Sequence, residues 1–239
     1  MFLAIKEIKH VKLRYGLIIL MIFLISYLIF ILSVGLASEN TQAIGSWDAQ
    51  KVILNKNSNV SMFQSILTKK DVKNANVGKD EAYVGQLGIV VKEKNRETVS
   101  AQFLGVKKNQ FIYQDQKLVS GKKATKNNQV TVDSSFRDKG YKLGDKISLN
   151  GSSKKYKIVG FVQNAKINIA PIVYGSLTTW KKMRMAAPNV VASAIISRDS
   201  SYKYNHKNAK TYPIAKFINK LPGYTAQNTT FELMIGFLF

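Results

Sequence analysis

A run of 24 residues without a charged side chain, Tyr15 to Ser38, is the feature that most constrains this chain. The hydrocarbon core of a bilayer is about 30 Å thick, and a helix of about 20 apolar residues crosses it. Leu, Ile, Phe and Val supply such a helix between Tyr15 and Leu36. The sequence therefore predicts one transmembrane helix over residues 15–37, close to the N-terminus.

The charges on either side of this run predict its orientation. Four basic residues lie before it, whereas Ala37, Ser38 and Glu39 follow it. Lys and Arg collect on the cytoplasmic side of membrane helices. We therefore expect a cytoplasmic amphipathic leader over residues 1–14 and an extracytoplasmic domain over residues 38–230. The alternative is a secreted protein, cleaved after Ala37 by signal peptidase.

The composition limits the chemistry of the outer domain. The chain has 36 Lys and Arg against 14 Asp and Glu, a net charge of +22. This excess could attract anionic lipid or acidic wall polymers, or it could be a solvated surface. Nucleic acid is not an expected partner, because the basic residues lie across the membrane and no aromatic-rich basic motif occurs.

Few residues suited to catalysis occur in the sequence. There is no cysteine, so we expect neither disulfides nor thiolate metal sites, and no metal site is predicted. An outer catalytic triad would have to use His206, which lies in a polar stretch. The phosphate-binding loop G-x-x-x-x-G-K-[ST] is absent, so this chain is not expected to bind ATP by that route. An exported hydrolase has no visible mechanism here, and we predict that the protein is not an enzyme.

Short strands separated by Gly, Asn and Asp predict an α+β fold for the outer domain. Asn150 and Gly151 between two such strands predict a hairpin turn. Asp145 is expected to serve a turn, Trp47 and Trp180 to pack, and the Asp80–Glu81 pair to be solvated. The expected strands are 51–54, 88–92, 99–106, 129–132, 146–149, 156–162, 172–174 and 190–197, and the expected helices are 60–68, 134–140, 177–185 and 213–221.

The C-terminal residues 231–239 are apolar except for Glu232, after a polar stretch over 224–230. Two interpretations remain open. The segment could be a short tail docked on the domain, or it could be the start of a second transmembrane helix. We favour the second, because the apolar residues are dense.

Several segments together resemble one family. They are the leader Met1-Phe2-Leu3-Ala4-Ile5-Lys6-Glu7-Ile8, the apolar run, the block Gly140–Ile147 continuing through Tyr156–Phe161, and the stretch Asn164–Tyr174. Their order and spacing are similar to those of the FtsX-like, MacB-type ABC transporter permeases, and within them to the HrtB haem-exporter branch of Gram-positive bacteria. The resemblance covers nearly the whole chain.

The resemblance implies a permease of the cell membrane with a large MacB-like core domain between its first and second helices. Such permeases work as homodimers with a separate ABC ATPase subunit, which binds the ATP, and they transmit motion across the lipid membrane to expel a substrate. Haem could be that substrate. A chain that ends at the second helix would then be truncated or a fragment. The alternative function is a single-pass, membrane-anchored binding module on the outer surface.

The same resemblance suggests a substrate site. Glu39 and Glu232 would lie at the outer membrane boundary, where acidic residues of the haem-exporter branch are thought to bind haem. Tyr224, Phe231 and Met234 could add ring or sulfur contacts to a flat apolar ligand. The alternative is that the two carboxylates are merely interfacial and that the aromatic residues are membrane anchors.

Overall fold

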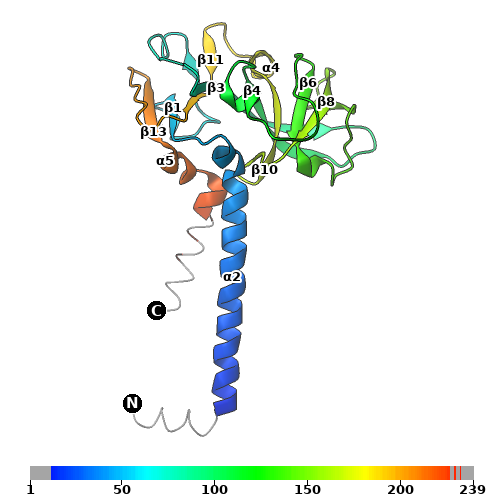
Figure 1. The fold of residues 1–239 in the computed structure, drawn as a ribbon, viewed down its shortest axis with the longest axis vertical. Helices are drawn as coiled ribbons and strands as arrows, with labels where there is room; N and C mark the ends of the chain where they lie inside the picture. Colours follow the sequence, from blue (N-terminus) through cyan, green and yellow to red (C-terminus); the bar gives the residue numbers. More distant parts are fainter. Residues whose placement is uncertain (1–11, 227–228, 230–231, 233–239) are drawn as a thin grey trace.

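One long helix carries a mixed α+β head in the computed structural model, which describes residues 12–226, 229 and 232 (Figure 1). Helix α2 (Lys12–Ser46) has 35 residues, which corresponds to about 52 Å. Its stretch Lys12–Leu32 is long and apolar enough to cross a membrane, and none of it is buried against the head. An apolar helix is therefore present where the sequence predicts a transmembrane helix, and it continues beyond residue 37 to Ser46.

The strands and helices of the head confirm the predicted α+β class. The strands are β1 (Lys51–Asn55), β2 (Leu67–Thr68), β3 (Glu81–Lys92), β4 (Val99–Val106), β5 (Leu118–Gly121), β6 (Gln129–Asp133), β7 (Lys146–Leu149), β8 (Lys155–Val162), β9 (Lys166–Ile167), β10 (Ala170–Ser176), β11 (Val190–Ala192), β12 (Ala194–Ser197) and β13 (Ala209–Pro213). The helices are α3 (Phe111–Gln114), a 3₁₀ helix (Ser134–Phe136), α4 (Leu177–Met183) and α5 (Ile214–Ile218).

Six strands close into a small barrel in the order β3, β4, β10, β6, β8 and β7. The ring closes because β7 pairs with both β8 and β3. Two of the contacts are parallel, β4 with β10 and β6 with β8, and the others are antiparallel. Apolar side chains such as Phe103, Phe136 and Ile158 fill the interior. Closure leaves few unpaired edges within the ring.

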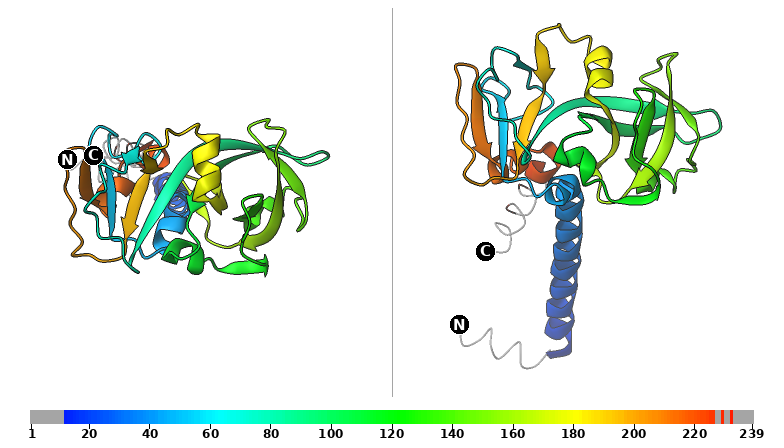
Figure 2. Two further views of the ribbon diagram at one scale, coloured as in Figure 1. Left: turned by 90° about the horizontal axis from the view of Figure 1, so that it is seen from above. Right: turned by 45° about the horizontal axis from the view of Figure 1, so that its top comes forward.

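A smaller antiparallel sheet, β13-β1-β12-β3, forms the other half of the head. The two halves share β3, whose residues 81–84 pair with β12 and whose residues 85–91 pair with β4. Seen from above, the smaller sheet and the barrel lie on opposite sides of the axis of α2 (Figure 2). The shared strand therefore joins both halves into one continuous structure above the helix.

Helix α4 packs on the barrel through Trp180, which is fully buried. Its indole ring lies on Gly85 of β3 and Gly105 of β4, which are directly opposite each other. The indole Nε1 donates a hydrogen bond to the carbonyl oxygen of Gln86 at 3.0 Å. The two glycines are needed because a Cβ atom at Gly85 would lie only 2.1 Å from the ring. Packing of Trp180, as predicted, is confirmed.

Most of the predicted elements are present, but the helix predicted over 60–68 is wrong and that predicted over 134–140 is only a short 3₁₀ helix, Ser134–Phe136. Asn150 and Gly151, with φ of 51° and 70°, form the predicted turn, in which the N–H of Ser152 donates to Leu149 O at 3.1 Å. The connection between β7 and β8 is longer than two residues, because the last strand pair is Ser148 with Lys155. Residues 60–68, by contrast, form turns that end in β2. Asn59 and Val60 have φ of 51° and 57°, which an α-helix does not allow. The serine hydroxyls nearby bond to local backbone groups and favour the turns.

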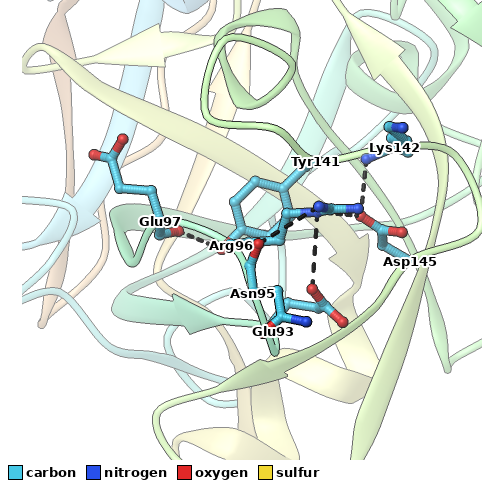
Figure 3. A network of polar contacts seen from close by, with 7 residues as sticks. All are labelled: Glu93, Asn95, Arg96, Glu97, Tyr141, Lys142 and Asp145. Carbon is cyan, nitrogen blue, oxygen red and sulfur yellow. Dashed lines mark hydrogen bonds and ion pairs between the residues drawn. The ribbon is translucent and has the colours of Figure 1, made fainter.

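A polar network ties the loop between β3 and β4 to the loop before β7 (Figure 3). Arg96 Nε lies 3.3 Å from Asp145 Oδ2 and 3.8 Å from Glu93 Oε2. The same Asp145 oxygen accepts the backbone N–H of Lys142 at 2.9 Å, which confirms its predicted role in the turn. The hydroxyl of Tyr141 donates to the carbonyl oxygen of Glu97 at 2.7 Å. This network holds the two loops together at one end of the barrel.

Candidate functional site

The junction between α2 and the head is the strongest candidate for a functional site. The last turns of α2 enter the core, where Ala43, Ile44 and Trp47 are buried. They share one apolar cluster with Leu54 of β1 and Ile172 of β10. A helix that merely tethered the head would need no such burial. The membrane helix and the two halves of the head are therefore packed as one body.

The end of α2 is fixed by its backbone hydrogen bonds. The N–H of Ala49 donates to Ile44 O at 3.4 Å, and the N–H of Asp48 donates to Gly45 O at 3.1 Å. This pair of bonds is a Schellman motif, whose C′ residue adopts the left-handed conformation. Asp48 occupies that position with φ of 52°. The chain thus turns sharply from the helix into β1.

Trp47 links the helix end to the barrel. Its indole Nε1 donates to the hydroxyl oxygen of Tyr174 on β10 at 3.2 Å, and both side chains are buried. Its carbonyl oxygen accepts a 3.0 Å bond from Arg198 Nε. Burial raises the pKa of Tyr174 well above its ordinary value, although the bond from Trp47 acts in the opposite sense. The phenol therefore stays neutral, and the junction contains a bond between two uncharged groups.

Arg198 extends the junction toward α3. Its guanidinium group pairs with the carboxylate of Asp115 and lies 4.1 Å from the centre of the Phe111 ring. A cation over an aromatic face and a carboxylate partner both favour a fixed guanidinium. Arg198 follows β12, so this residue joins the smaller sheet, the helix end and α3.

A hollow of about 270 Å³ lies beside the C-terminal segment. Phe217 and Leu221, both buried, lie on one of its sides, and Asn168 of the β9–β10 turn lies on another. Asn168 Oδ1 accepts the backbone N–H of Gly223 at 2.5 Å. The remaining lining residues are Val60, Ser61, Met62, Phe63, Gln64, Gln86, Gln102, Ile167, Lys220 and Pro222. The hollow is mainly apolar, so it suits the apolar part of a ligand.

The predicted substrate residues are placed only in part. Tyr224 is half-buried and packs against the apolar cluster that contains the end of α2. Glu232 is helical and exposed. Glu39 lies within α2, but its side chain is not described. Phe231 and Met234 lie outside the described residues, as does the leader over 1–11. That Glu39 and Glu232 form a substrate site at the outer membrane boundary therefore stays a prediction.

The acidic and histidine side chains that the structure describes show no arrangement suited to a metal ion. Among the residues that the structure describes, no group of three or more could hold a metal ion. Asp71 is buried, and its carboxylate accepts hydrogen bonds from Thr68 and Asn208. Burial alone would raise the pKa of its carboxyl group, but hydrogen bonds from Thr68 and Asn208 outweigh this effect and lower the pKa. This carboxylate is explained by its structural bonds.

Sequence reasoning missed several parts of the junction. Tyr174 and Arg198 are separated from Trp47 by 127 and 151 residues, so no local pattern could connect them. The hollow was missed for the same reason, because its residues come from distant segments. The apolar periodicity of residues 213–221 was its one local signal, and it correctly indicated that Phe217 and Leu221 share a buried face.

Comparison with known proteins adds relatives over the whole chain. The hemin transport system permease protein HrtB of Staphylococcus epidermidis (strain RP62A) is 26% identical over 243 residues, covering all of this chain and 68% of that protein. HrtB of Staphylococcus haemolyticus is 26% identical over 250 residues, with the same coverage. No family model matches the chain.

A solved structure matches the head in fold. The periplasmic region of MacB from Actinobacillus actinomycetemcomitans aligns with a TM-score of 0.51 at 13% identity, covering 77% of this chain and 98% of that one. The identity is too low to show more than the fold. The predicted resemblance is confirmed: this chain is similar to ABC transporter permeases with a MacB-like extracellular domain, and a membrane location follows.

Proposed function

We propose that this chain, a relative of the HrtB permeases along its whole length, is a permease component of an ABC-type exporter. In this proposal its N-terminus is cytoplasmic and its head is extracytoplasmic. The permease forms a homodimer and works with a separate ATPase subunit, which supplies the energy. Its own residues carry motion across the membrane and do no bond-breaking chemistry.

The continuity of α2 is the observation that carries this proposal. One helix of 35 residues begins at Lys12, crosses the apolar stretch and ends inside the core of the head. Only residues 39–42 lie between the uncharged run, which ends at Ser38, and Ala43 in the core of the head, a separation of about 6 Å along the helix. A shift of the helix would therefore move the head, because Trp47 is bonded to β10.

The proposed substrate is a hydrophobic or amphiphilic molecule, with haem as the first candidate. HrtB is named for hemin transport, and the shared sequence extends over all of this chain. Glu39 and Glu232 are the proposed polar contacts, with Tyr224, Phe231 and Met234 as apolar ones. The 270 Å³ hollow next to the segment that leads to Tyr224 offers an apolar surface on the head.

The orientation can be tested with single cysteines, since the natural chain has none. Ser153→Cys lies in the exposed β7–β8 turn, and Lys12→Cys lies at the start of α2. A membrane-impermeant maleimide should label Ser153→Cys in intact cells and Lys12→Cys only after permeabilisation. The reverse pattern would refute the proposed orientation.

Transmission through the helix can be tested by insertions between Asn40 and Thr41. Four glycines cost about 1 kcal/mol each in a helix and should uncouple the head from the membrane. Four alanines keep the helix and rotate the head by only about 40°. We expect cells that express the protein from its native gene to lose haem tolerance with the glycine insertion and to keep most of it with the alanine insertion. Equal activity of both variants would contradict mechanical transmission.

The substrate residues need a separate test. Haem titration of the purified protein should show weaker binding for the double variant Glu39→Gln, Glu232→Gln than for the natural protein. Glu93→Gln in the barrel loop is the matched control, because it removes one carboxylate far along the chain from the boundary. Unchanged haem affinity of the double variant would remove these residues from the proposed site.

A further inference from the structure

A groove lined by lysines crosses the C-terminal ends of β4 and β10. Its wider part has a volume of about 310 Å³ and contains Lys107, Lys108 and Lys181 beside the start of α4. Its narrower part has about 20 Å³ and contains Lys108 and Lys126. The two parts share Val106, Lys108 and Ser176, so they are continuous.

No acidic residue lines either part, among the residues that the structure describes. Among all the residues that the structure describes, the ion pairs involve the basic residues Arg96, Lys139 and Arg198. None of them involves a lysine of the groove. Burial, together with the charges of Lys107 and Lys69, lowers the pKa of Lys181. The ammonium group of Lys107 lies over the Tyr83 ring, 4.4 Å from its centre. No carboxylate of the described residues lines the groove, so an anion would relieve the remaining positive charge.

A buried amide at the narrow part gives independent support. Gln116 is 8% exposed, and its Oε1 accepts a 3.0 Å bond from the hydroxyl of Thr131. Its Nε2 is buried and has no hydrogen-bond partner among the described residues. An unpaired buried donor costs about 1–3 kcal/mol, so such groups normally have a partner. A volume of about 20 Å³ admits an oxygen atom of a ligand or a single water molecule.

We propose that this groove binds a phosphate group, with the ammonium groups of Lys107, Lys108 and Lys181 around the anion and the amide of Gln116 donating to a ligand oxygen. Phosphate fits better than a single carboxylate, because it carries up to two charges and more acceptor oxygens than a carboxylate offers. Lysine binds phosphate as a mobile point charge. The source can be a free phosphate compound or the headgroup of an anionic lipid.

Gln116 also connects the groove to the helix junction. It lines a second small cavity together with Trp47 and Tyr174, the pair that joins α2 to β10. An anion held by Gln116 therefore sits one side chain away from the Trp47–Tyr174 bond. This placement does not depend on which substrate the protein exports or on a partner ATPase.

The test uses the full chain in nanodiscs without any ATPase. Pyrophosphate is titrated by calorimetry in neutral phosphatidylcholine nanodiscs, and phosphatidylglycerol binding is measured by exchange into the same discs. Saturable binding of either probe supports the site, and the two arms identify the source. No saturable binding of either would overturn the proposal and leave a water molecule as the partner of Gln116.

Substitutions distinguish specific binding of phosphate in the groove from nonspecific attraction of an anion to a basic protein. Lys107→Gln with Lys181→Gln should weaken binding at least tenfold. Lys203→Gln with Lys207→Gln removes the same charge from an exposed loop and should change binding less than twofold. Gln116→Met, which keeps the size of the side chain, should weaken binding severalfold. Equal weakening by both lysine pairs would overturn the site. That comparison uses only the lysine variants, so it stands even if Gln116→Met folds poorly.

Discussion

The contact between Trp180 and Gly85 predicts that Gly85→Ala, which adds one methyl group, lowers the stability of the head strongly. In Gly85→Ala, the new Cβ would lie 2.1 Å from Cδ2 of the indole ring, whereas ordinary contacts begin near 3.4 Å. The ring must therefore move by more than 1 Å. It has no free space to enter, because Trp180 is fully buried between α4 and the barrel.

The expected loss of stability follows from two costs and one gain. Overpacking a core costs about 1–3 kcal/mol. Losing the bond from Trp180 Nε1 to Gln86 O adds about 1 kcal/mol, and the restricted unfolded chain returns about 0.4–1 kcal/mol. The net loss is about 1–4 kcal/mol, with a middle value of about 2 kcal/mol, so Tm of a domain of this size should fall by about 4–8 °C at that value.

Thermal unfolding in detergent, followed by tryptophan fluorescence, measures this effect. Fluorescence is preferable to helical circular dichroism, because α2 can remain helical in the micelle. Gly88→Ala is the matched control in the same strand, since its Cβ would lie 3.5 Å from the Phe63 ring, an ordinary contact. We expect its Tm to stay close to that of the natural protein. Equal Tm values for both variants would refute the argument from the Trp180 contact.

Three further predictions concern the junction and the smaller sheet. Asp48→Gly should raise Tm by about 2–4 °C in the same assay, because glycine adopts the left-handed C′ conformation without strain. Tyr174→Phe should cost about 1–3 kcal/mol by leaving the buried N–H of Trp47 without an acceptor, as measured by urea unfolding. The pKa of Asp71 is lower in the folded protein than in the unfolded chain, where it is about 4. The ionised carboxylate should therefore stabilise the fold fully above about pH 4, and this stabilisation should be lost as the pH falls through the folded-state pKa. Asp71→Asn should therefore lower Tm at pH 7 and flatten its decline in acid, and an unchanged acid decline would contradict the assignment.

Local patterns in the sequence were enough to predict the parts of the fold that depend on near neighbours. The apolar run predicted α2, and Asn150–Gly151 predicted the β7–β8 hairpin, because a span or a two-residue turn is fixed by adjacent residues. The helix predicted over 60–68 does not form, because hydrogen bonds of nearby serine hydroxyls favour turns there.

Long-range pairings could not be predicted in this way. The Asp80–Glu81 pair was expected to be solvated, yet Glu81 is buried, and its carboxylate accepts bonds from Ser197 Oγ and the N–H of Gly78. Only the pairing of β3 with β12 brings Ser197 to that carboxylate. The closure of the barrel by β7 is a similar case, because it depends on strands that lie far apart in the sequence.

The position of β10 connects the junction and the lysine groove. Tyr174 of this strand accepts the bond from Trp47, and Tyr174, Gly175 and Ser176 all line the narrow part of the groove. A strand paired on both sides cannot shift one residue without its neighbours, and β10 pairs with β4 and β6. A change at the end of α2 must therefore reach the groove through the barrel. Phosphate affinity should consequently change in Tyr174→Phe, because Tyr174 both lines the narrow part of the groove and accepts the bond from Trp47, and an unchanged affinity would show that the two sites are independent.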